Sequence, residues 1–344
     1  MTSDSTPPQS APQPSEPPAP NSEATSDSGD GFSLESTLNW ATFEIPPKLR
    51  AWLELCRLPN VFTAMADPLA GALIVGAGWR YSFSIVLLML SGAVFYAGGV
   101  VLNDWHDFKK DLSERPHRPL PSKRIARWKA LGVACGLLAL GVVFAAMAAG
   151  TRGPFRVSLL LLIAIVGYDI LLKNVPVAPG AMGLCRGLNL LMGMSLIPFE
   201  GEAIGIGART YLFVIMTAYI TGVTIFASKE TMADQRKRLM IGTVTTLTPV
   251  FALMGIGFAF GDIDTSSFGT LFVAGLLGIV GFMMLRALLT PDPPHVQKAV
   301  KTAVLGVVVL DAAMVALLGS AVGAVAICLL LIPAIWLGKW VYST

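Results

Sequence analysis

The residues whose types and spacing best suit a chemical role form one acidic run, NDWHDFKKD, at positions 103–111. On a helix, Asn103, Asp107 and Asp111 are spaced at i, i+4 and i+8, so we expect their oxygens to form one stripe, which Asp104 adjoins. Carboxylates crowded beside an apolar segment repel one another unless a cation lies between them, and Mg²⁺ prefers oxygen ligands. The run therefore predicts a Mg²⁺ site.

A second acidic pair, Glu230 and Asp234, has i, i+4 spacing and follows another apolar run, with basic residues on both sides. Two acidic sets at equivalent ends of two helices are what a metal-bound diphosphate needs. The predicted metal ligands are Asn103, Asp104, Asp107, Asp111, Glu230 and Asp234, and the predicted catalytic residues are Asp107, Asp111 and Asp234. The alternative is that these acids are ordinary loop charges paired with neighbouring lysines and arginines.

Other polar residues lie inside or at the ends of apolar runs, where they are costly and therefore suggest a function. The residues predicted to bind substrate are Arg57, Asn60, Arg118, Tyr168, Lys173, Arg186, Asn189 and Lys229. Arg118 belongs to a proline-stiffened loop, RPHRPLPSKR, whose guanidinium groups would close over a diphosphate held at the acidic run. For Asp67, Asp169 and Asp311, hydrogen bonding between buried helices and contact with substrate both stay open.

The composition defines the environment of these residues. The chain has 344 residues, of which 54% are hydrophobic and 14% charged, and its mean hydropathy is +0.65. A soluble core does not absorb so much apolar surface, and apolar runs of about 20 residues recur, each able to cross a bilayer as a helix. We expect an all-α integral membrane protein at residues 48–344, preceded by a disordered tail rich in Pro and Ser at residues 1–47.

The membrane domain is predicted to be a polytopic bundle of nine or ten transmembrane helices. The expected spans are 58–78, 83–104, 129–149, 156–173, 179–199, 209–228, 241–260, 267–290, 299–319 and 321–342. Only a short glycine-containing stretch separates the last two, so both counts stay open. In the span at 179–199, Gly183 and Gly187 have GxxxG spacing, which favours close helix packing.

Basic residues gather on one side of the expected bundle. Eight of them lie between Lys109 and Lys129, on the same side as the two acidic sets. Because basic loops are retained in the cytoplasm, we expect the N-terminus and the mouth of the site to face the cytoplasm, in a bacterial inner membrane. The basic loops are short and carry no recognisable nucleic-acid-binding module, so membrane lipids and no nucleic acid are the expected surroundings.

These motifs resemble those of the UbiA superfamily of intramembrane prenyltransferases. The acidic run matches the first family motif, NDxxDxxxD, and the following RPLPS resembles the family's loop, whereas Glu230 departs from the second motif, DxxxD. The likeness covers roughly residues 51–320. The combination of GGVVLNDWHD, YDILLK and CRGLNLLMG looks like the Ebo-operon branch.

The resemblance implies a UbiA-type fold, usually of nine helices, and specific roles for residues at the site. Asn103 and Asp107 would join Glu230 and Asp234 in holding Mg²⁺, while Arg57 and Lys173 would contact the diphosphate. The implied reaction moves a prenyl group from a prenyl diphosphate to a lipophilic acceptor, aromatic or other, through a carbocation-like transition state. The alternatives are a membrane transporter and another metal-dependent transferase such as a CDP-alcohol phosphotransferase. The acceptor, the prenyl chain length and the oligomeric state stay open.

Overall fold

The computed structural model describes residues 46–148, 152–173, 175–198, 204–228, 235–260 and 267–340, and these residues form helices joined by short connections, with no strand among them. The helices are α1 (Pro47–Leu55), α2 (Leu58–Ile74), α3 (Ser82–His106), α4 (Phe108–Glu114), α5 (Arg127–Met147), α6 (Gly153–Gly167), α7 (Ala178–Met194), α8 (Ile206–Ala227), α9 (Gln235–Leu253), α10 (Ile256–Ala259), α11 (Ser267–Leu289), α12 (Pro293–Leu317), α13 (Ala321–Leu329) and α14 (Leu331–Trp340). Two further segments are the 3₁₀ turn η1 (Trp79–Tyr81) and the π-helical turn η2 (Tyr168–Leu172), which continues α6.

Each of the ten expected spans coincides with helix in the described structure, so the all-α prediction is confirmed. Within the described residues, seven helical segments are long and apolar enough to cross a membrane: Ser82–His106, Arg127–Met147, Gly153–Leu172, Ile206–Ala227, Phe268–Leu289, Pro293–Leu317 and Ala321–Lys339. The last one contains the break between α13 and α14, whereas α2 is a shorter apolar helix. Most of the expected tail at residues 1–47 lies outside the described residues.

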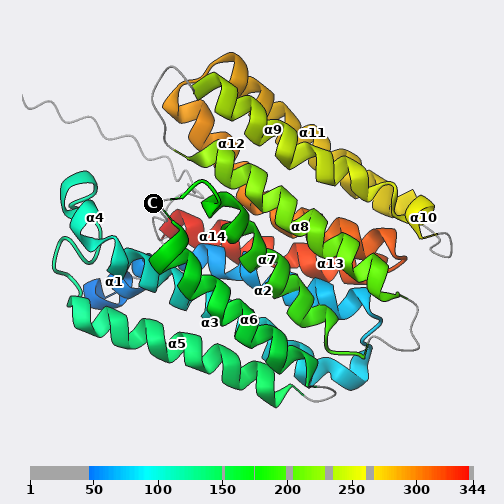
Figure 1. The fold of residues 1–344 in the computed structure, drawn as a ribbon, viewed down its shortest axis with the longest axis horizontal. Helices are drawn as coiled ribbons and strands as arrows, with labels where there is room; N and C mark the ends of the chain where they lie inside the picture. The colour runs from blue at the N-terminus through cyan, green and yellow to red at the C-terminus, as the bar shows by residue number, and fades with distance from the viewer. Residues whose placement is uncertain are drawn as a thin grey trace, which may run out of the picture. The chain divides into compact units, whose positions relative to one another are not determined.

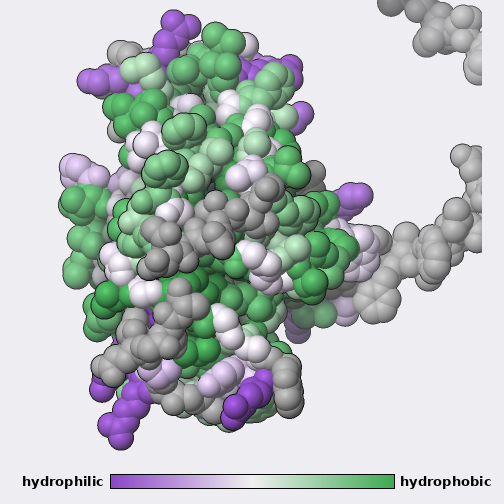
Figure 2. Space-filling model, turned by 90° about the vertical axis from the view of Figure 1, so that its right-hand side faces the viewer, coloured by the Kyte–Doolittle hydropathy of each residue, from purple (hydrophilic) through white to green (hydrophobic). Residues whose placement is uncertain are grey.

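The described helices carry an apolar exterior. Large hydrophobic side chains are exposed along several helices, among them Ile163 on α6, Phe251 on α9 and Leu271 on α11. On the face shown in Figure 2, hydrophobic residues predominate and hydrophilic ones gather mainly at the upper and lower edges. Soluble monomers rarely expose so much contiguous apolar surface, so lipid is the solvent that suits this exterior.

Helix α7 runs through the middle of the bundle, between α2 and α8 (Figure 1). Its glycines allow very close approach: a Cβ added at Gly193 would lie 2.2 Å from the Pro68 carbonyl oxygen of α2, and one at Gly183 would lie 2.3 Å from the Thr217 carbonyl oxygen of α8. The packing role expected for Gly183 is therefore confirmed. Gly187 has the same role, since its Cβ would lie 2.2 Å from Thr217 Oγ1. Close contact between helices fixes the polar side chains of α7 against α2.

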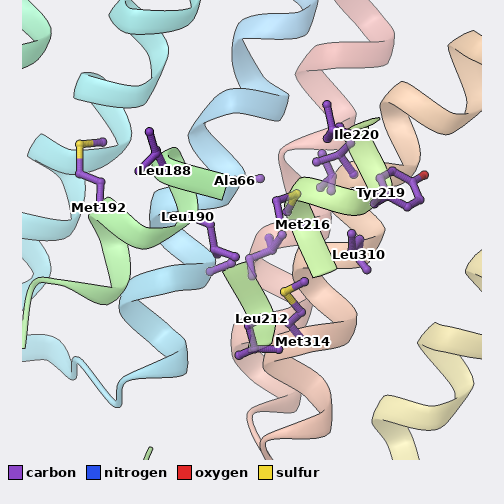
Figure 3. Close-up of a cluster of buried hydrophobic side chains, with 14 of the residues drawn as sticks. Ala66, Leu188, Leu190, Met192, Leu212, Met216, Tyr219, Ile220, Leu310 and Met314 are labelled. Atoms are coloured by element: carbon purple, nitrogen blue, oxygen red, sulfur yellow. The ribbon is translucent and has the colours of Figure 1, made fainter. Parts of the chain in front are cut away.

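The apolar core lies where α7 and α8 meet α12 (Figure 3). Met192 of α7, Met216 of α8 and Leu310 of α12 are each fully buried there. The Tyr219 hydroxyl, a polar group in this cluster, donates to the Ala303 carbonyl oxygen of α12 at 2.8 Å, so it is satisfied without water. This core joins α12 rigidly to the central helices.

Candidate active site

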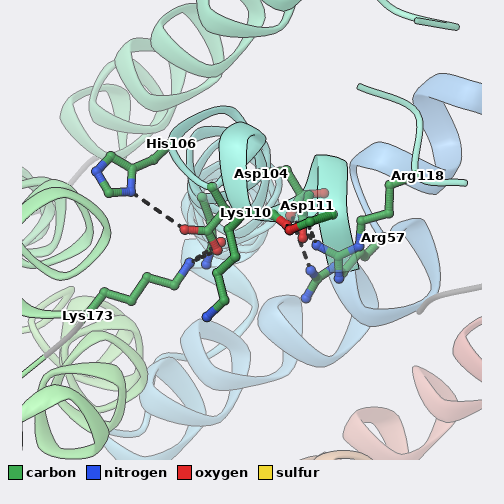
Figure 4. Close-up of polar contacts among 10 residues, drawn as sticks. Arg57, Asp104, His106, Lys110, Asp111, Arg118 and Lys173 are labelled. Atoms are coloured by element: carbon green, nitrogen blue, oxygen red, sulfur yellow. Dashed lines mark hydrogen bonds and ion pairs between the residues drawn. The ribbon is translucent and has the colours of Figure 1, made fainter. Parts of the chain in front are cut away.

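The acidic run lies at the junction of α3 and α4. Helix α3 ends at His106, Asp107 caps it, and α4 begins at once, while the backbone N–H of Asp111 still donates to the Asp107 carbonyl oxygen at 2.9 Å. The run therefore keeps nearly helical spacing across the junction. Its side chains, however, face two separate sets of partners instead of forming the single stripe that we expected (Figure 4).

The first set of contacts joins Asn103 and Asp107 to one cation. Lys173 Nζ donates to Asn103 Oδ1 at 2.6 Å and to Asp107 Oδ2. Lys173 directly follows η2, and such π-helical turns are frequent at functional sites because they re-aim the residues that follow. His106 Nδ1 lies 3.6 Å from Asp107 Oδ1, so this histidine borders the site (Figure 4). Two oxygens from α3 thus converge on one point beside α6.

The second set of contacts buries Asp104 and Asp111 against arginines (Figure 4). Arg118 Nη1 lies 2.9 Å from Asp111 Oδ2 and 3.3 Å from Asp104 Oδ1, and Arg57 Nη2 lies 3.4 Å from the same Asp104 oxygen. Arg118 is only 5% exposed. Arg118, which we expected to cover a diphosphate, thus fastens its loop to the end of α3, and its contact with a diphosphate stays a prediction.

Arg57 has an unusual backbone conformation between α1 and α2. Its φ of 47° and ψ of 51° are left-handed, which is costly for a residue with a side chain and is often found at functional sites. Burial raises the pKa of the preceding Cys56 thiol to about 11, so that neighbour stays uncharged. The strained turn directs the Arg57 side chain toward Asp104, at the boundary of two cavities.

The two cavities differ in character. One, of about 130 Å³, is lined mainly by apolar residues of α2, α3, α6 and α7, and among its few polar lining residues are Asn103, Tyr168 and Asp169. The other, of about 420 Å³, is polar and is lined by Glu54, Arg57, Asp104, His117, Arg118, Pro119 and Arg124. Only Arg57 lines both. A charged mouth thus adjoins an apolar chamber.

Arg186 and Asn189 line the apolar chamber from α7, but their inner ends are bound to α2. Arg186 Nη2 donates to Asp67 Oδ1 at 2.8 Å and to the Thr63 carbonyl oxygen at 2.9 Å. Asn189 Nδ2 donates to Asp67 Oδ2 and to the Ala64 carbonyl oxygen, both at 2.8 Å. Asp67 thus hydrogen-bonds between helices, which was one of its two open interpretations. Asn60, in contrast, lies in the first turn of α2 and does not line either cavity.

Three predicted site residues, Lys229, Glu230 and Asp234, lie outside the described residues. Among the residues that are described, no group of three or more His, Cys, Asp or Glu side chains is arranged to hold a metal ion. The described part of the predicted metal site therefore amounts to the converging oxygens of Asn103 and Asp107.

Sequence reasoning missed part of the polar cavity. Arg124 was not among the predicted substrate-binding residues, yet it lines the polar cavity: its Nη1 lies 2.6 Å from Glu54 Oε2 of α1 and its Nη2 donates to the His117 carbonyl oxygen at 2.9 Å. The contact of Arg124 with Glu54 joins residues 70 positions apart. No local spacing signals such a contact, although the prolines around Arg118 did indicate a fixed loop.

A model of the UbiA prenyltransferase family matches residues 65–299, which is more than half of the chain. The chain therefore belongs to the UbiA prenyltransferase family. Together with the seven apolar helices, this membership identifies it as an integral membrane protein.

Curated relatives include digeranylgeranylglyceryl phosphate synthases. The one from Methanopyrus kandleri is 30% identical over 51% of this chain and 60% of its own length, and the one from Sulfolobus acidocaldarius is 28% identical over 52% and 60%. The one from Ignicoccus hospitalis is 37% identical over 28% of this chain and 31% of its own length. The chain thus spans between 31% and 60% of the length of these relatives.

Solved structures share the fold. A digeranylgeranylglyceryl phosphate synthase structure superposes with a TM-score of 0.59 at 20% identity, covering 82% of this chain and all of that one. A UbiA homologue from Aeropyrum pernix superposes with a TM-score of 0.58 at 16% identity, covering 74% of this chain and 96% of that one. At these identities the likeness concerns the fold alone, and it confirms the UbiA-type fold.

Proposed function

We propose that this protein transfers a prenyl group from a Mg²⁺-bound prenyl diphosphate to a lipophilic acceptor. The observation that carries the proposal is that Asn103 and Asp107 direct two oxygens at one point, occupied by the Lys173 ammonium group, at the end of α3. Asn103 also lines the apolar chamber, so the charged point and the chamber adjoin. A prenyl diphosphate has the matching division into a charged head and an apolar tail.

The donor set fits Mg²⁺, which prefers oxygen ligands and keeps room in its shell for water and substrate phosphate. Asn103 and Asp107 would hold the ion on α3, and Glu230 and Asp234 of the second motif would supply further ligands. When bound, the ion would neutralise the departing diphosphate. Asp104 and Asp111, which we predicted as further ligands, face Arg118, so we assign them to holding the loop beside the site.

The basic residues around the mouth have distinct roles in this proposal. Lys173 reaches the same point as the metal ligands, so its ammonium group would turn to the diphosphate oxygens. Arg57 would bind the diphosphate from the boundary of the two cavities, and Lys229 would join from the second motif. The apolar chamber would bind the tail and keep water away from the allylic cation.

The acceptor would enter the apolar chamber, where Tyr168, Arg186 and Asn189 supply polar groups. Since the curated relatives are named for making digeranylgeranylglyceryl phosphate, a prenylated glyceryl phosphate is the first acceptor to test. Aromatic acceptors form the second class. We place the mouth and the N-terminus on the cytoplasmic side, because eight basic residues surround the α3 end of the bundle.

The proposal is tested by ligand-dependent thermal stabilisation of the detergent-purified protein, since a ligand that binds only the native state raises the melting temperature. Prenyl diphosphates of several lengths would be added with Mg²⁺ or with chelator. Stabilisation is expected only with Mg²⁺, and it should disappear in Asp107→Asn. The matched control is Glu114→Gln at the exposed end of α4. Equal stabilisation of the wild type and Asp107→Asn would contradict the assignment.

The transporter alternative predicts uptake of a solute into vesicles without chemical change. The buried charges Asp67 and Arg186 form an ion pair with each other, so neither is an unpaired charge that a translocation path would present to a solute. A product of higher mass from a prenyl diphosphate and an acceptor would separate the two functions directly.

A further inference from the structure

A fully buried polar cluster joins α2, α7 and α12 behind the wall of the apolar chamber. Asp67 of α2 and Asp311 of α12 are both 0% exposed, and Arg186 and Asn189 of α7 are 9% and 5% exposed. Ionisable groups within a membrane bundle are costly and pair with one another when present. We therefore asked which charges this cluster contains.

The two carboxyl groups differ in their hydrogen-bond partners. Asp67 accepts a charged hydrogen bond from Arg186 at one oxygen and an amide hydrogen bond from Asn189 at the other. Neither oxygen of Asp311 accepts a hydrogen bond from an N–H or hydroxyl donor of the described residues. The carboxyl group of Asp67 is the acidic neighbour of Asp311 where α12 packs against α2. A hydrogen bond between two carboxyl groups requires a proton on one of them.

The cluster contains one described cation for two acids. If both acids were ionised, one negative charge would remain uncompensated in a dry site, which costs far more than protonating a carboxyl group. Because Asp67 already has the guanidinium of Arg186, it is the acid that gains from ionisation. The proton therefore belongs on Asp311, whose O–H group then donates a hydrogen bond to the Asp67 carboxylate.

We propose that Asp311 is a protonated positioning residue: it donates a hydrogen bond to Asp67, whose single negative charge holds Arg186 and Asn189 in the wall of the acceptor chamber. Asp311 does not itself line the chamber, so it acts through Asp67. The proposal deepens the proposed function, on which its acceptor role rests.

The orientation of both α7 side chains follows from this network. The Asn189 amide has one possible direction, because its NH₂ group has two acceptors, Asp67 and the Ala64 carbonyl. Its Oδ1 is thereby directed at Gly92 of the chamber, where an added Cβ would lie only 2.9 Å away. In Arg186, Nη2 is fully used by α2, while Nη1 makes no hydrogen bond within the described residues. That N–H group is available to an oxygen of the acceptor.

The charge state is tested without turnover, by infrared spectroscopy of the full-length protein. The difference spectrum of wild type minus Asp311→Asn is expected to show the C=O stretching band of one protonated carboxyl group. Wild type minus Glu114→Gln, which removes an exposed ionised acid, should not show it. Loss of an ionised-carboxylate band instead would overturn the proposal. So would unfolding of Asp311→Asn, because asparagine keeps both the volume and the donated hydrogen bond.

The positioning role is tested with a second variant. Asp311→Leu replaces the donor with an apolar side chain and is expected to raise KM for the acceptor about ten-fold or more, with little change in stabilisation by prenyl diphosphate. Asp311→Asn should restore the wild-type KM. An unchanged KM in Asp311→Leu would sink the positioning role. The infrared result stands even where no acceptor is turned over, so failure of the proposed function is recognised separately.

Discussion

Arg118 Nη1 lies 2.9 Å from Asp111 Oδ2, and both side chains are about 95% buried. The same nitrogen also contacts Asp104, so one guanidinium is shared by two carboxylates at the end of α3. Removing it leaves Asp111 buried without this charge partner and Asp104 with Arg57 alone. Arg118→Met is therefore expected to lower the free energy of unfolding by about 3–5 kcal/mol. Thermal unfolding in detergent without substrate measures this change.

Arg124 provides the comparison for that variant. It forms an ion pair with Glu54, but its side chain is 39% exposed, and exposed ion pairs contribute about 1 kcal/mol at most. Arg124→Met should therefore unfold close to the wild-type temperature. Similar losses in both variants would show that burial of the Arg118 pair has no special role.

Lys173 is predicted to act on the diphosphate, since it reaches the point on which the metal ligands converge. Lys173→Met should lower kcat/KM for the prenyl diphosphate at least about ten-fold, because the variant loses the charge-assisted hydrogen bond from the Lys173 ammonium group to the diphosphate oxygens. Lys110→Met is the control, since Lys110 is an exposed lysine of the same acidic run. Steady-state rates of both variants test this prediction. Equal rates would show that Lys173 does not act on the diphosphate.

The second motif allows a prediction about Mg²⁺. Glu230→Gln removes a charged oxygen ligand, so the Mg²⁺ concentration needed for half-maximal stabilisation by prenyl diphosphate should rise about ten-fold or more. Glu230→Asp restores the family's DxxxD pattern and should stay near the wild type. A Mg²⁺ titration of the melting temperature measures both. Wild-type behaviour of Glu230→Gln would restrict metal binding to other residues.

Much of the fold was predictable from the sequence because a bilayer imposes a simple rule. Apolar runs of sufficient length must form helices with satisfied backbone groups. The expected span at 83–104 and the helix Ser82–His106 accordingly differ by only a few residues. The short stretch between the last two expected spans corresponds to the break between α12 and α13, whereas the break between α13 and α14, inside the span 321–342, was not predicted.

Side-chain partners were less predictable, because they depend on which helices meet. Helical spacing placed Asp104 and Asp107 together, but Asp104 faces Arg118 whereas Asp107 faces Lys173. The spacing within one helix does not reveal the neighbours on each side of it. Asp67 and Asp311 are 244 positions apart, so the hydrogen bond proposed between them depends on the packing of α12 against α2.

The close contact of α2 with α7 holds two helices that line the apolar chamber, and it leads to a prediction about stability. A Cβ at Gly193 would lie 2.2 Å from the Pro68 carbonyl oxygen, and backbone cannot yield there without separating the helices. Gly193→Ala is therefore expected to destabilise the protein by about 1–3 kcal/mol. Gly136→Ala on α5 is the control, because its Cβ would meet nothing within 4 Å and alanine favours helix over glycine. Thermal unfolding should separate the two variants in opposite directions. If Gly193→Ala instead unfolded at or above the wild-type temperature, the backbone contact of α2 with α7 would be looser than described, and the positions of Arg186 and Asn189 would not depend on it.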